Sequence, residues 1–215
     1  MEQVEMTIEF IMRARKAYTS GINLDELSKQ GKMDSVCSAV SSALWISGDV
    51  RRDTVIHTVL EGPSNGPKTI TFTGAEIKGL RHDERSIASY ISEALKKGAF
   101  LGKNEETKVR TGIKVAKKSF ERLVWERSKG KRVLVLDEKG KDIRKTELPR
   151  DFVVIFGSAE GLPPKTEKMM KDINAVRVSL GPRILFASHC PIIVHNEADR
   201  RIQEMRQTAD RRKSL

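Results

Sequence analysis

The stretch V-S-L-G-P-R-I-L-F-A-S-H-C-P-I-I-V-H-N-E-A-D-R, residues 178–200, decides the fold, because a glycine-proline turn separates two apolar segments and a helix follows. Gly181 lets the backbone come close to a ligand, and Pro182 holds Gly181 away from helical geometry. We expect a buried strand over 184–187, then a helix over about 189–205 with Ser188 as its N-cap. By itself this pattern fits a strand, turn and helix of any α/β domain.

The segment upstream favours a ligand site over an ordinary α/β unit. It reads D-F-V-V-I-F-G-S-A-E-G-L-P-P-K-T-E-K-M-M over residues 151–170. An unbroken apolar strand is typical of a parallel sheet covered on both faces. Ligands of such sheets bind beyond the carboxyl ends of the strands, where Gly157, Gly161 and, one unit later, Gly181 fall. The loop G-S-A-E-G is neither a dinucleotide fingerprint nor a Walker loop. A nucleoside cofactor without phosphates is therefore favoured.

The rest of the chain alternates strands with helices, which predicts an α/β fold with a largely parallel sheet. The length of 215 residues suits a single domain without a disulfide or metal staple. We expect strands over 5–14, 54–60, 68–73 and 132–136, helices over 33–47, 83–97 and 117–127, a turn over 137–140 and an exposed crossing over 98–112.

Charge indicates a polyanionic partner. Lysine and arginine exceed aspartate and glutamate by 40 to 29, which gives a net charge of +11. A highly charged solvated surface is the alternative. Aromatic residues make up only 5% of the chain, so a folded RNA read at one flipped base is favoured over a stacking platform for single strands.

Cysteine usage and hydropathy indicate a soluble cytoplasmic protein. Cys37 and Cys190 form no C-x-x-C pair, and histidines do not cluster, so we expect reduced thiols and no metal site. The apolar runs are too short to span a membrane, and the N-terminal sequence lacks the pattern of a secretory signal.

Six ordered motifs carry a family resemblance: G-K-M-D-S-V-C-S-A-V-S-S-A-L-W-I-S at 31–47, L-E-G-P-S-N-G-P-K-T-I at 60–70, G-L-R-H-D-E-R-S-I-A at 79–88, G-L-P at 161–163, S-L-G-P-x-x-L-x-A-x-x-C at 179–190 and H-N-E-x-D-R at 195–200. With these motifs the chain resembles the archaeal tRNA (pseudouridine-54 N1)-methyltransferase TrmY family of the SPOUT class. It departs from the family at Lys32, often arginine there, in the loop of residues 157–159, and in a tail over 201–215 that is longer and more basic.

The resemblance implies a single SPOUT domain over 1–215, a mostly parallel sheet flanked by helices, with a C-terminal trefoil knot and a cofactor-binding region over about 132–205. It implies methylation of N1 of pseudouridine 54 in the T-loop of tRNA, S-adenosyl-L-methionine as cofactor and a homodimer. Other substrates remain open: pseudouridine N1 or a ribose 2′-OH in ribosomal RNA. A non-enzymatic RNA-binding protein that has kept the fold is the more distant alternative.

The candidate site residues come partly from this resemblance, which implies the cofactor contacts and supports Asp34, and partly from the charge and position of the basic residues. Asp34 is the first candidate to contact the target base, although an aspartate in the first turn of a helix also serves as a cap. Cys190 is a candidate for the active site, although a buried cysteine is usually a small hydrophobe. Cofactor contacts are expected from Leu136, Gly157, Leu180, Gly181, Ile184, Leu185 and Cys190. RNA contacts are expected from Lys32, Arg51, Arg52, Arg81 and Arg85, for which solvated surface positions are the alternative.

The end of the chain has two further features. The motif H-N-E-x-D-R, with His195, is predicted to be an interface or a structural helix end rather than a metal site. The basic tail over 200–213 is either a charged helix extension or an arm that contacts RNA.

Overall fold

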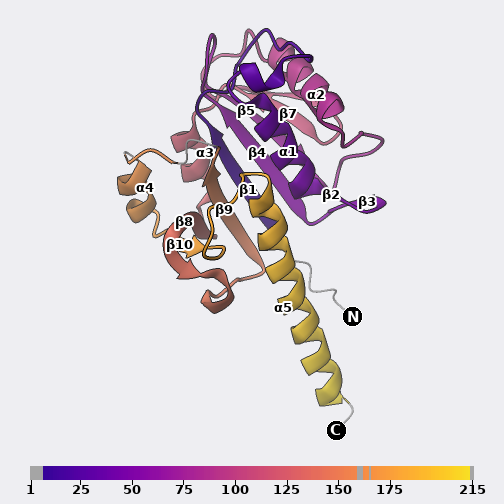
Figure 1. Cartoon of the computed structure of the whole chain (residues 1–215), viewed down its shortest axis with the longest axis vertical. Helices are drawn as coiled ribbons and strands as arrows, with labels where there is room; N and C mark the ends of the chain where they lie inside the picture. The colour runs from indigo at the N-terminus through magenta and orange to yellow at the C-terminus, as the bar shows by residue number, and fades with distance from the viewer. Residues whose placement is uncertain (1–6, 159–161, 165, 214–215) are drawn as a thin grey trace.

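A computed structural model describes residues 7–158, 162–164 and 166–213 of the chain. Its centre is an eight-stranded sheet in the order β10-β8-β9-β1-β4-β5-β7-β6 (Figure 1). The strands are β1 (Thr7–Ala14), β4 (Thr54–Leu60), β5 (Lys68–Thr73), β6 (Glu106–Arg110), β7 (Ile113–Ala116), β8 (Arg132–Asp142), β9 (Asp151–Gly157) and β10 (Val176–Ser179). A separate small hairpin pairs β2 (Trp45–Ile46) with β3 (Asp49–Val50).

The half of the sheet around β1 is parallel, as the apolar strands predict. Phe10 of β1 lies opposite Ile56 of β4 and Val154 of β9, and β8 and β10 continue the parallel pairing. All three side chains are fully buried, because helices cover both faces here. Beyond β4, the strands β5, β7 and β6 pair antiparallel. The fold is therefore α/β with a mostly parallel central sheet.

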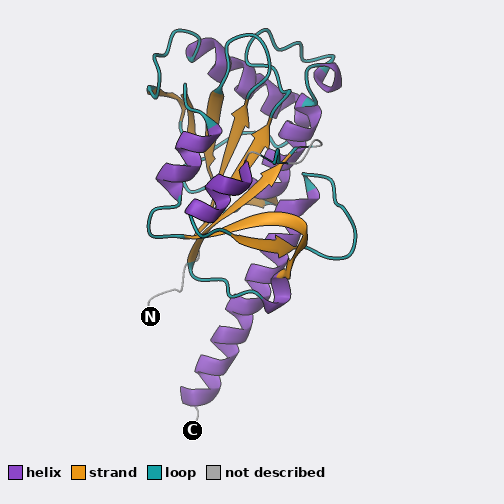
Figure 2. Ribbon diagram, turned by 90° about the vertical axis from the view of Figure 1, so that its left-hand side faces the viewer, coloured by secondary structure: helices purple, strands orange, loops and turns teal. Residues whose placement is uncertain are grey.

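Helices form a layer on each face of the sheet (Figures 1 and 2). One hydrophobic cluster joins the sheet to α1 (Met33–Leu44), α2 (Glu84–Lys97) and α5 (His189–Lys213). A second cluster joins the opposite face to α3 (Phe120–Arg127) and α4 (Thr166–Asp172). Alternation along β1 divides the two clusters, since Phe10 belongs to the first and Ile11 to the second. Two short 3-10 helices, η1 (Leu27–Lys29) and η2 (Ile143–Lys145), lie in connecting segments.

The ends of α2 follow from the sequence. Asp83 caps the helix by accepting a hydrogen bond from the backbone N–H of Ser86 at 2.9 Å. Lys96 and Lys97 occupy the last turn, where positive charge interacts favourably with the helix dipole. The cap, its dipole charges and the amphipathic pattern agree, so the predicted boundaries are confirmed to within one residue.

Several predicted elements are wrong. Residues 184–187 form a loop rather than a buried strand: Ile184 is 85% and Phe186 77% exposed, and only Ala187 is buried. The predicted crossing over 98–112 contains β6, and β7 was not foreseen. The turn expected over 137–140 lies within β8, whose pairing with β10 jumps from Val135 to Lys141 across an irregularity. Helix α1 ends at Leu44 because Trp45 is extended, and α5 continues past 205 to Lys213.

Candidate functional site

The main candidate site is a pocket of about 660 Å³ at the carboxyl ends of β9 and β10. The irregular stretch of β8, the loop after β10, the first turn of α5 and Ser35 of α1 complete its walls. The position agrees with the general rule that ligands of open α/β sheets bind beyond the carboxyl ends of the strands. The two glycine-containing segments of the sequence therefore do meet at one site.

All seven residues expected at the cofactor line this single pocket: Leu136, Gly157, Leu180, Gly181, Ile184, Leu185 and Cys190. Gly181 has a φ of +142°, which side-chain-bearing residues rarely adopt. The side-chain oxygen of Ser179 accepts a hydrogen bond from the Gly181 N–H at 3.3 Å and donates one to the Gly181 carbonyl at 3.0 Å. Local hydrogen bonds thus hold the turn in the conformation that brings backbone to the pocket.

Sequence reasoning missed other lining residues. Ser35 and Phe156 are two of them. Each is adjacent in sequence to a predicted site residue, Asp34 and Gly157 respectively, and this adjacency could have identified them. The others are Asp137, Glu138, Ser158, Val178, Ser179, Arg183, Phe186 and Ala187. Residues 159–161 of the glycine loop lie outside the described residues.

The chemistry of the lining suits a nucleoside cofactor. Leucine, isoleucine and phenylalanine side chains supply apolar walls for the faces of a purine, while carboxylates, serines and strand-end backbone supply hydrogen-bonding groups. The volume lies within the usual range for small-ligand sites. The charged lining residues are Asp137, Glu138 and Arg183, a set that offers little positive charge to a phosphate chain. S-adenosylmethionine, which has a nucleoside but no phosphate, fits this lining.

Cys190 lies in the first turn of α5 and lines the pocket. Its thiol donates a hydrogen bond to the carbonyl of Phe186 at 3.6 Å. Burial raises the pKa of Cys190 to about 11, so the thiol stays protonated at neutral pH. Burial thus outweighs any lowering of the pKa of this thiol by the helix N-terminus.

Asp34 lies in the first turn of α1, next to Ser35 of the pocket. It does not cap this helix: Lys32 occupies the N-cap position with a φ of +63°, and no side-chain cap hydrogen bond forms. The Oδ1 atom of Asp34 is buried and has no hydrogen-bond partner among the described residues. A buried oxygen without a partner costs free energy, which favours a role in binding over a role in capping.

Three of the basic candidates are exposed near the starts of α1 and α2. Lys32 is exposed at the start of α1. Arg81 and Arg85 are exposed at the start of α2 and pair with Asp83 at 3.2 Å and Asp25 at 2.6 Å. The two helices pack together, and Ser41 of α1 donates a hydrogen bond to the carbonyl of His82 at 3.0 Å. The start of α2 thus lies against the C-terminal half of α1, whereas Asp34 is in the first turn of that helix.

The other two basic candidates make internal contacts. Arg51, whose side chain is 12% exposed, binds both carboxylate oxygens of Asp199 on α5 at 3.0 and 2.5 Å. Arg52 donates hydrogen bonds to the carbonyls of Gly74 at 3.1 Å and Ile77 at 2.6 Å. Their predicted contacts with RNA phosphate would require these internal contacts to open.

The motif H-N-E-x-D-R holds the base of α5 in place. His195 is buried, hydrogen-bonds the Ala43 carbonyl at 2.9 Å, and has a pKa lowered to about 4, chiefly by burial. Asp199 of the motif binds Arg51. Just after the motif, Arg201 donates hydrogen bonds to the carbonyls of Thr146 at 2.6 Å and Ile143 at 2.8 Å. These contacts confirm a structural role for the motif, but the predicted helix end is wrong, because α5 continues to Lys213.

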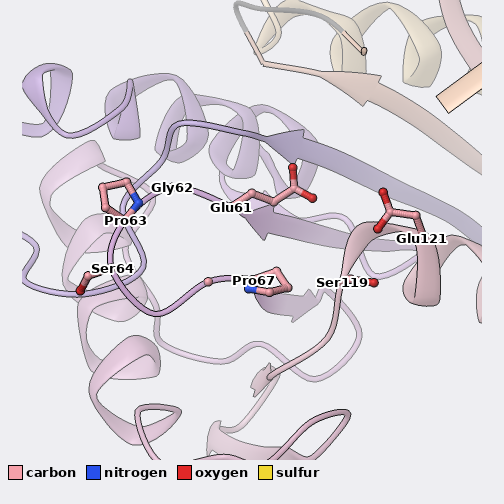
Figure 3. A pocket seen from close by; sticks show the side chains of 8 residues that line it. Glu61, Gly62, Pro63, Ser64, Pro67, Ser119 and Glu121 are labelled. Carbon is pink, nitrogen blue, oxygen red and sulfur yellow. The ribbon is translucent and has the colours of Figure 1, made fainter. Parts of the chain in front are cut away.

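A second hollow of about 500 Å³ lies beside the loop that follows β4 (Figure 3). Glu61 and Glu121 turn their carboxylates toward one another there, and Arg13 pairs with them at 2.8 and 3.0 Å. Hydrogen bonds fix the loop, since Thr19 N–H donates to the Pro63 carbonyl at 2.8 Å. Its acidic lining does not suit an RNA phosphate.

A buried charged cluster lies on the α3 side of the sheet. Burial acts to raise the pKa of Glu9, but the imidazole of His57, whose Nε2 lies 3.4 Å from the Glu9 carboxylate, the hydrogen bond from Lys131 and the charge of Arg127 together lower it to about 2. The pKa of His57 itself is lowered by burial. Its Nδ1 lies 2.8 Å from the Thr71 hydroxyl, so neutral His57 and ionised Glu9 are the states expected at pH 7.

Within the described ranges, no group of three or more histidine, cysteine, aspartate or glutamate side chains is placed to hold a metal ion. Across the same part of the chain, no helix combines the length and apolar character that crossing a membrane requires.

Comparison with known proteins adds four findings. The family described as "Putative SAM-dependent RNA methyltransferase" matches residues 7–203. A tRNA (pseudouridine(54)-N(1))-methyltransferase of Methanococcus aeolicus is 41% identical, over 90% of this chain and 98% of that protein. A protein of the same name from Methanocaldococcus jannaschii is 38% identical, over 90% and 97%. The crystal structure of Archaeoglobus fulgidus Nep1 bound to S-adenosylhomocysteine shares the fold at a TM-score of 0.57 and 14% identity, over 91% of this chain and 98% of that one.

Proposed function

This chain belongs to the family of SAM-dependent RNA methyltransferases that includes the tRNA (pseudouridine(54)-N(1))-methyltransferases, and we propose that it methylates N1 of pseudouridine 54 in tRNA. S-adenosylmethionine is the cofactor of the family. The relatives match at high coverage of both chains, so their activity is the natural proposal for the whole protein.

One structural observation carries the proposal to named residues. The pocket that suits S-adenosylmethionine ends at Ser35, and the adjacent Asp34 holds a buried oxygen without a hydrogen-bond partner in the described structure. A partner from outside the chain would satisfy that oxygen. The imino N–H of a base beside the pocket is such a donor.

Each part of the site then has a task. When bound, S-adenosylmethionine supplies an electrophilic methyl group on its sulfonium. The backbone at Gly157 and Gly181 orients the cofactor, and apolar lining residues exclude water. Asp34 accepts the proton of pseudouridine N1, either directly or through one water, and holds the nitrogen in line with the methyl group. Cys190, protonated at neutral pH, shapes the pocket.

RNA is held by charges outside the pocket. Lys32, Arg81 and Arg85 lie exposed next to Asp34's helix, and the chain carries a net charge of +11. Phosphate contacts from these side chains fix the register of the RNA without reading its sequence. They would bring the target loop to the pocket, where a single flipped base enters.

The experiment that tests this function compares two tRNA transcripts that differ at one nucleotide. The purified chain is incubated with S-adenosylmethionine and tRNA carrying either pseudouridine or uridine at position 54, and nucleosides are analysed by mass spectrometry. Methylpseudouridine is expected from the first transcript alone, because N1 of uridine is its glycosidic nitrogen. A product methylated on ribose, or equal methylation of both transcripts, would contradict the proposal.

We further propose a homodimer, with the exposed apolar side chains of the loop before α5 and of the start of α5 at its interface. Ile184 is 85%, Phe186 77%, Ile192 50% and Ile193 37% exposed, and large apolar side chains exposed close together in the sequence suit an interaction surface. Sedimentation should give a dimer for the unchanged chain and a monomer for Phe186→Ser with Ile193→Ser. A monomeric unchanged chain would contradict the proposal.

The remaining features of the proposal concern the chain as a whole. The chain acts as one domain, which the continuous sheet from β10 to β6 supports. Residues of about 132–205 form the trefoil knot of SPOUT enzymes, which the fold likeness to Nep1 supports. A tRNA-modifying enzyme of this kind works in the cytoplasm, where its substrate lies.

A further inference from the structure

Helix α5 continues past the part of the chain that the family shares. The helix spans His189–Lys213, whereas the family match ends at residue 203. In its first half, Val194, His195 and Ala198 are buried. All side chains from Gln203 to Thr208 are exposed, and Figures 1 and 2 both show this end of the helix extending beyond the sheet. We call residues 203–213 the helical extension.

The helical extension has an excess of positive charge. Its basic residues are Arg206, Arg211, Arg212 and Lys213, and its acidic residues are Glu204 and Asp210. Because the side chains of residues 203–208 are all exposed, this part of the helix gains no stability from burial of an apolar face. A polyanion is the partner that matches its charge.

The base of the helix is fixed firmly to the body. Arg201 donates to the carbonyls of Ile143 and Thr146, and Asp199 binds Arg51 at both carboxylate oxygens. The direction of the helical extension is therefore set by contacts immediately before it. At about 1.5 Å per residue, its basic positions lie roughly 24 to 35 Å along the helix from Cys190 in the pocket.

We propose that the helical extension is an RNA-binding arm that contacts backbone phosphates of the tRNA remote from nucleotide 54. This inference rests on the proposed function, because it takes the same tRNA as its partner. A second copy of the chain fits less well. The helical extension offers a partner chain one large apolar side chain, that of Met205, which is 49% exposed. Two basic helical extensions would also repel each other.

The arm predicts a difference between two RNAs. A full tRNA carries phosphates far from its target loop, whereas a hairpin that reproduces only the stem and loop around nucleotide 54 offers fewer within reach of the arm. Loss of the arm's charge should therefore weaken binding to tRNA and leave hairpin binding unchanged. Each lost phosphate contact also reduces the salt dependence of binding by about one in the slope of log K against log salt.

The test uses two variants of the full 215-residue chain with opposite changes in charge. The first is Arg206→Gln, Arg211→Gln, Arg212→Gln and Lys213→Gln together. The control is Glu204→Gln and Asp210→Gln together. Glutamine is a good helix former, so both variants retain helix propensity. Binding to tRNA and to the hairpin is measured across a range of salt concentrations, with circular dichroism, sedimentation and S-adenosylmethionine binding as checks on the fold.

For the first variant we expect about tenfold weaker tRNA binding, a salt slope smaller by about two to four and hairpin binding within about twofold of the unchanged chain. The control should bind tRNA about two- to threefold more tightly. The proposal of an RNA-binding arm is overturned if the first variant binds tRNA as tightly as the unchanged chain, or if it loses the same affinity for both RNAs. It is also overturned if the oligomeric state changes and the RNA affinity does not. If the unchanged chain binds tRNA but yields no methylpseudouridine, the proposed function fails. The same binding comparison still shows whether the helical extension contacts tRNA.

Discussion

Replacing Gly181 by alanine should weaken cofactor binding while leaving the protein folded. Gly181 has a φ of +142°, and a Cβ built there meets no atom within 4 Å. Steric overlap therefore costs nothing, and the whole penalty comes from the backbone conformation. Such strain costs of order 1–3 kcal/mol for a residue with a side chain. The turn is exposed and short, so it would relax by moving its backbone rather than by unfolding the domain.

Relaxation of this turn acts on the pocket directly, because Leu180, Gly181 and Arg183 all line it. If binding S-adenosylmethionine requires the native turn, the strain must be restored on binding, and about 1–3 kcal/mol corresponds to a loss of affinity of about fivefold to 150-fold. Calorimetric titration of Gly181→Ala with S-adenosylmethionine measures this loss, and thermal unfolding measures the effect on stability.

Gly130→Ala is the matched control. Gly130 also has a positive φ, +71°, and open space where a Cβ would lie, but it precedes β8 at the amino end, away from the residues that line the pocket. It should lose about 1 kcal/mol of stability and bind the cofactor normally. The reasoning is refuted if Gly181→Ala binds S-adenosylmethionine as tightly as the unchanged chain, or if Gly130→Ala loses affinity to the same degree.

Four further predictions address single residues. Asp34→Asn should lower the rate of methyl transfer by about 100-fold or more with unchanged cofactor affinity, and a rate within about threefold of the unchanged chain would remove Asp34 from the reaction. Cys190→Ser should keep the rate within about tenfold, because a thiol with a pKa of about 11 is no nucleophile at pH 7; a loss of several thousandfold would argue for covalent catalysis. Glu9 has a folded-state pKa of about 2 against an ordinary 4.5, so it contributes about 2–3 kcal/mol of stability above pH 4.5 that is lost as the pH falls toward 2. Glu9→Gln should flatten urea-unfolding stability over that pH window, and an unchanged pH dependence would contradict the assignment. Arg51→Ala removes the contact with Asp199 and should cost about 1–2 kcal/mol of stability with little change in RNA affinity, whereas weaker RNA binding at full stability would favour a phosphate contact.

The parallel core of the fold could be predicted because its strands are apolar on both faces. The segment 151–156 has no polar residue after Asp151, and Phe152, Val153 and Val154 are all buried. The antiparallel strands β6 and β7 escaped prediction for the opposite reason. Residues 106–110 read E-T-K-V-R, and of these only Val109 is buried, so an edge strand with solvated charges has the composition of a loop.

The wrong strand over 184–187 shows where an apolar pattern misleads. Ile184 and Phe186 are apolar, and a run of such residues normally predicts burial within the chain. Here the same side chains are exposed beside the pocket, because this turn serves a site rather than the core. The rule that strand ends and the turns after them meet at one edge of a parallel sheet did predict that Gly157 and Gly181 share a site, whereas the other candidate cofactor residues came from the family resemblance. Arg51 and Arg201 bind partners that are roughly 150 and 55 residues away in the sequence. No local sequence pattern identifies partners at that separation.

The net charge of the chain overstates the positive charge that is free to bind RNA, because many arginines make contacts within the fold. A net charge of +11 predicts an RNA partner, but the fold commits many arginines to itself: Arg13 to two glutamates, Arg51 to Asp199 and Arg201 to backbone carbonyls. Two of the places where exposed positive charge remains are the start of α2 and the helical extension of α5, where Arg206 is exposed. Two separated contacts restrict the orientation of a rigid RNA more strongly than one contact of the same total charge. A site that must bring a single base to a methyl group benefits from that restriction, because positioning supplies much of the rate.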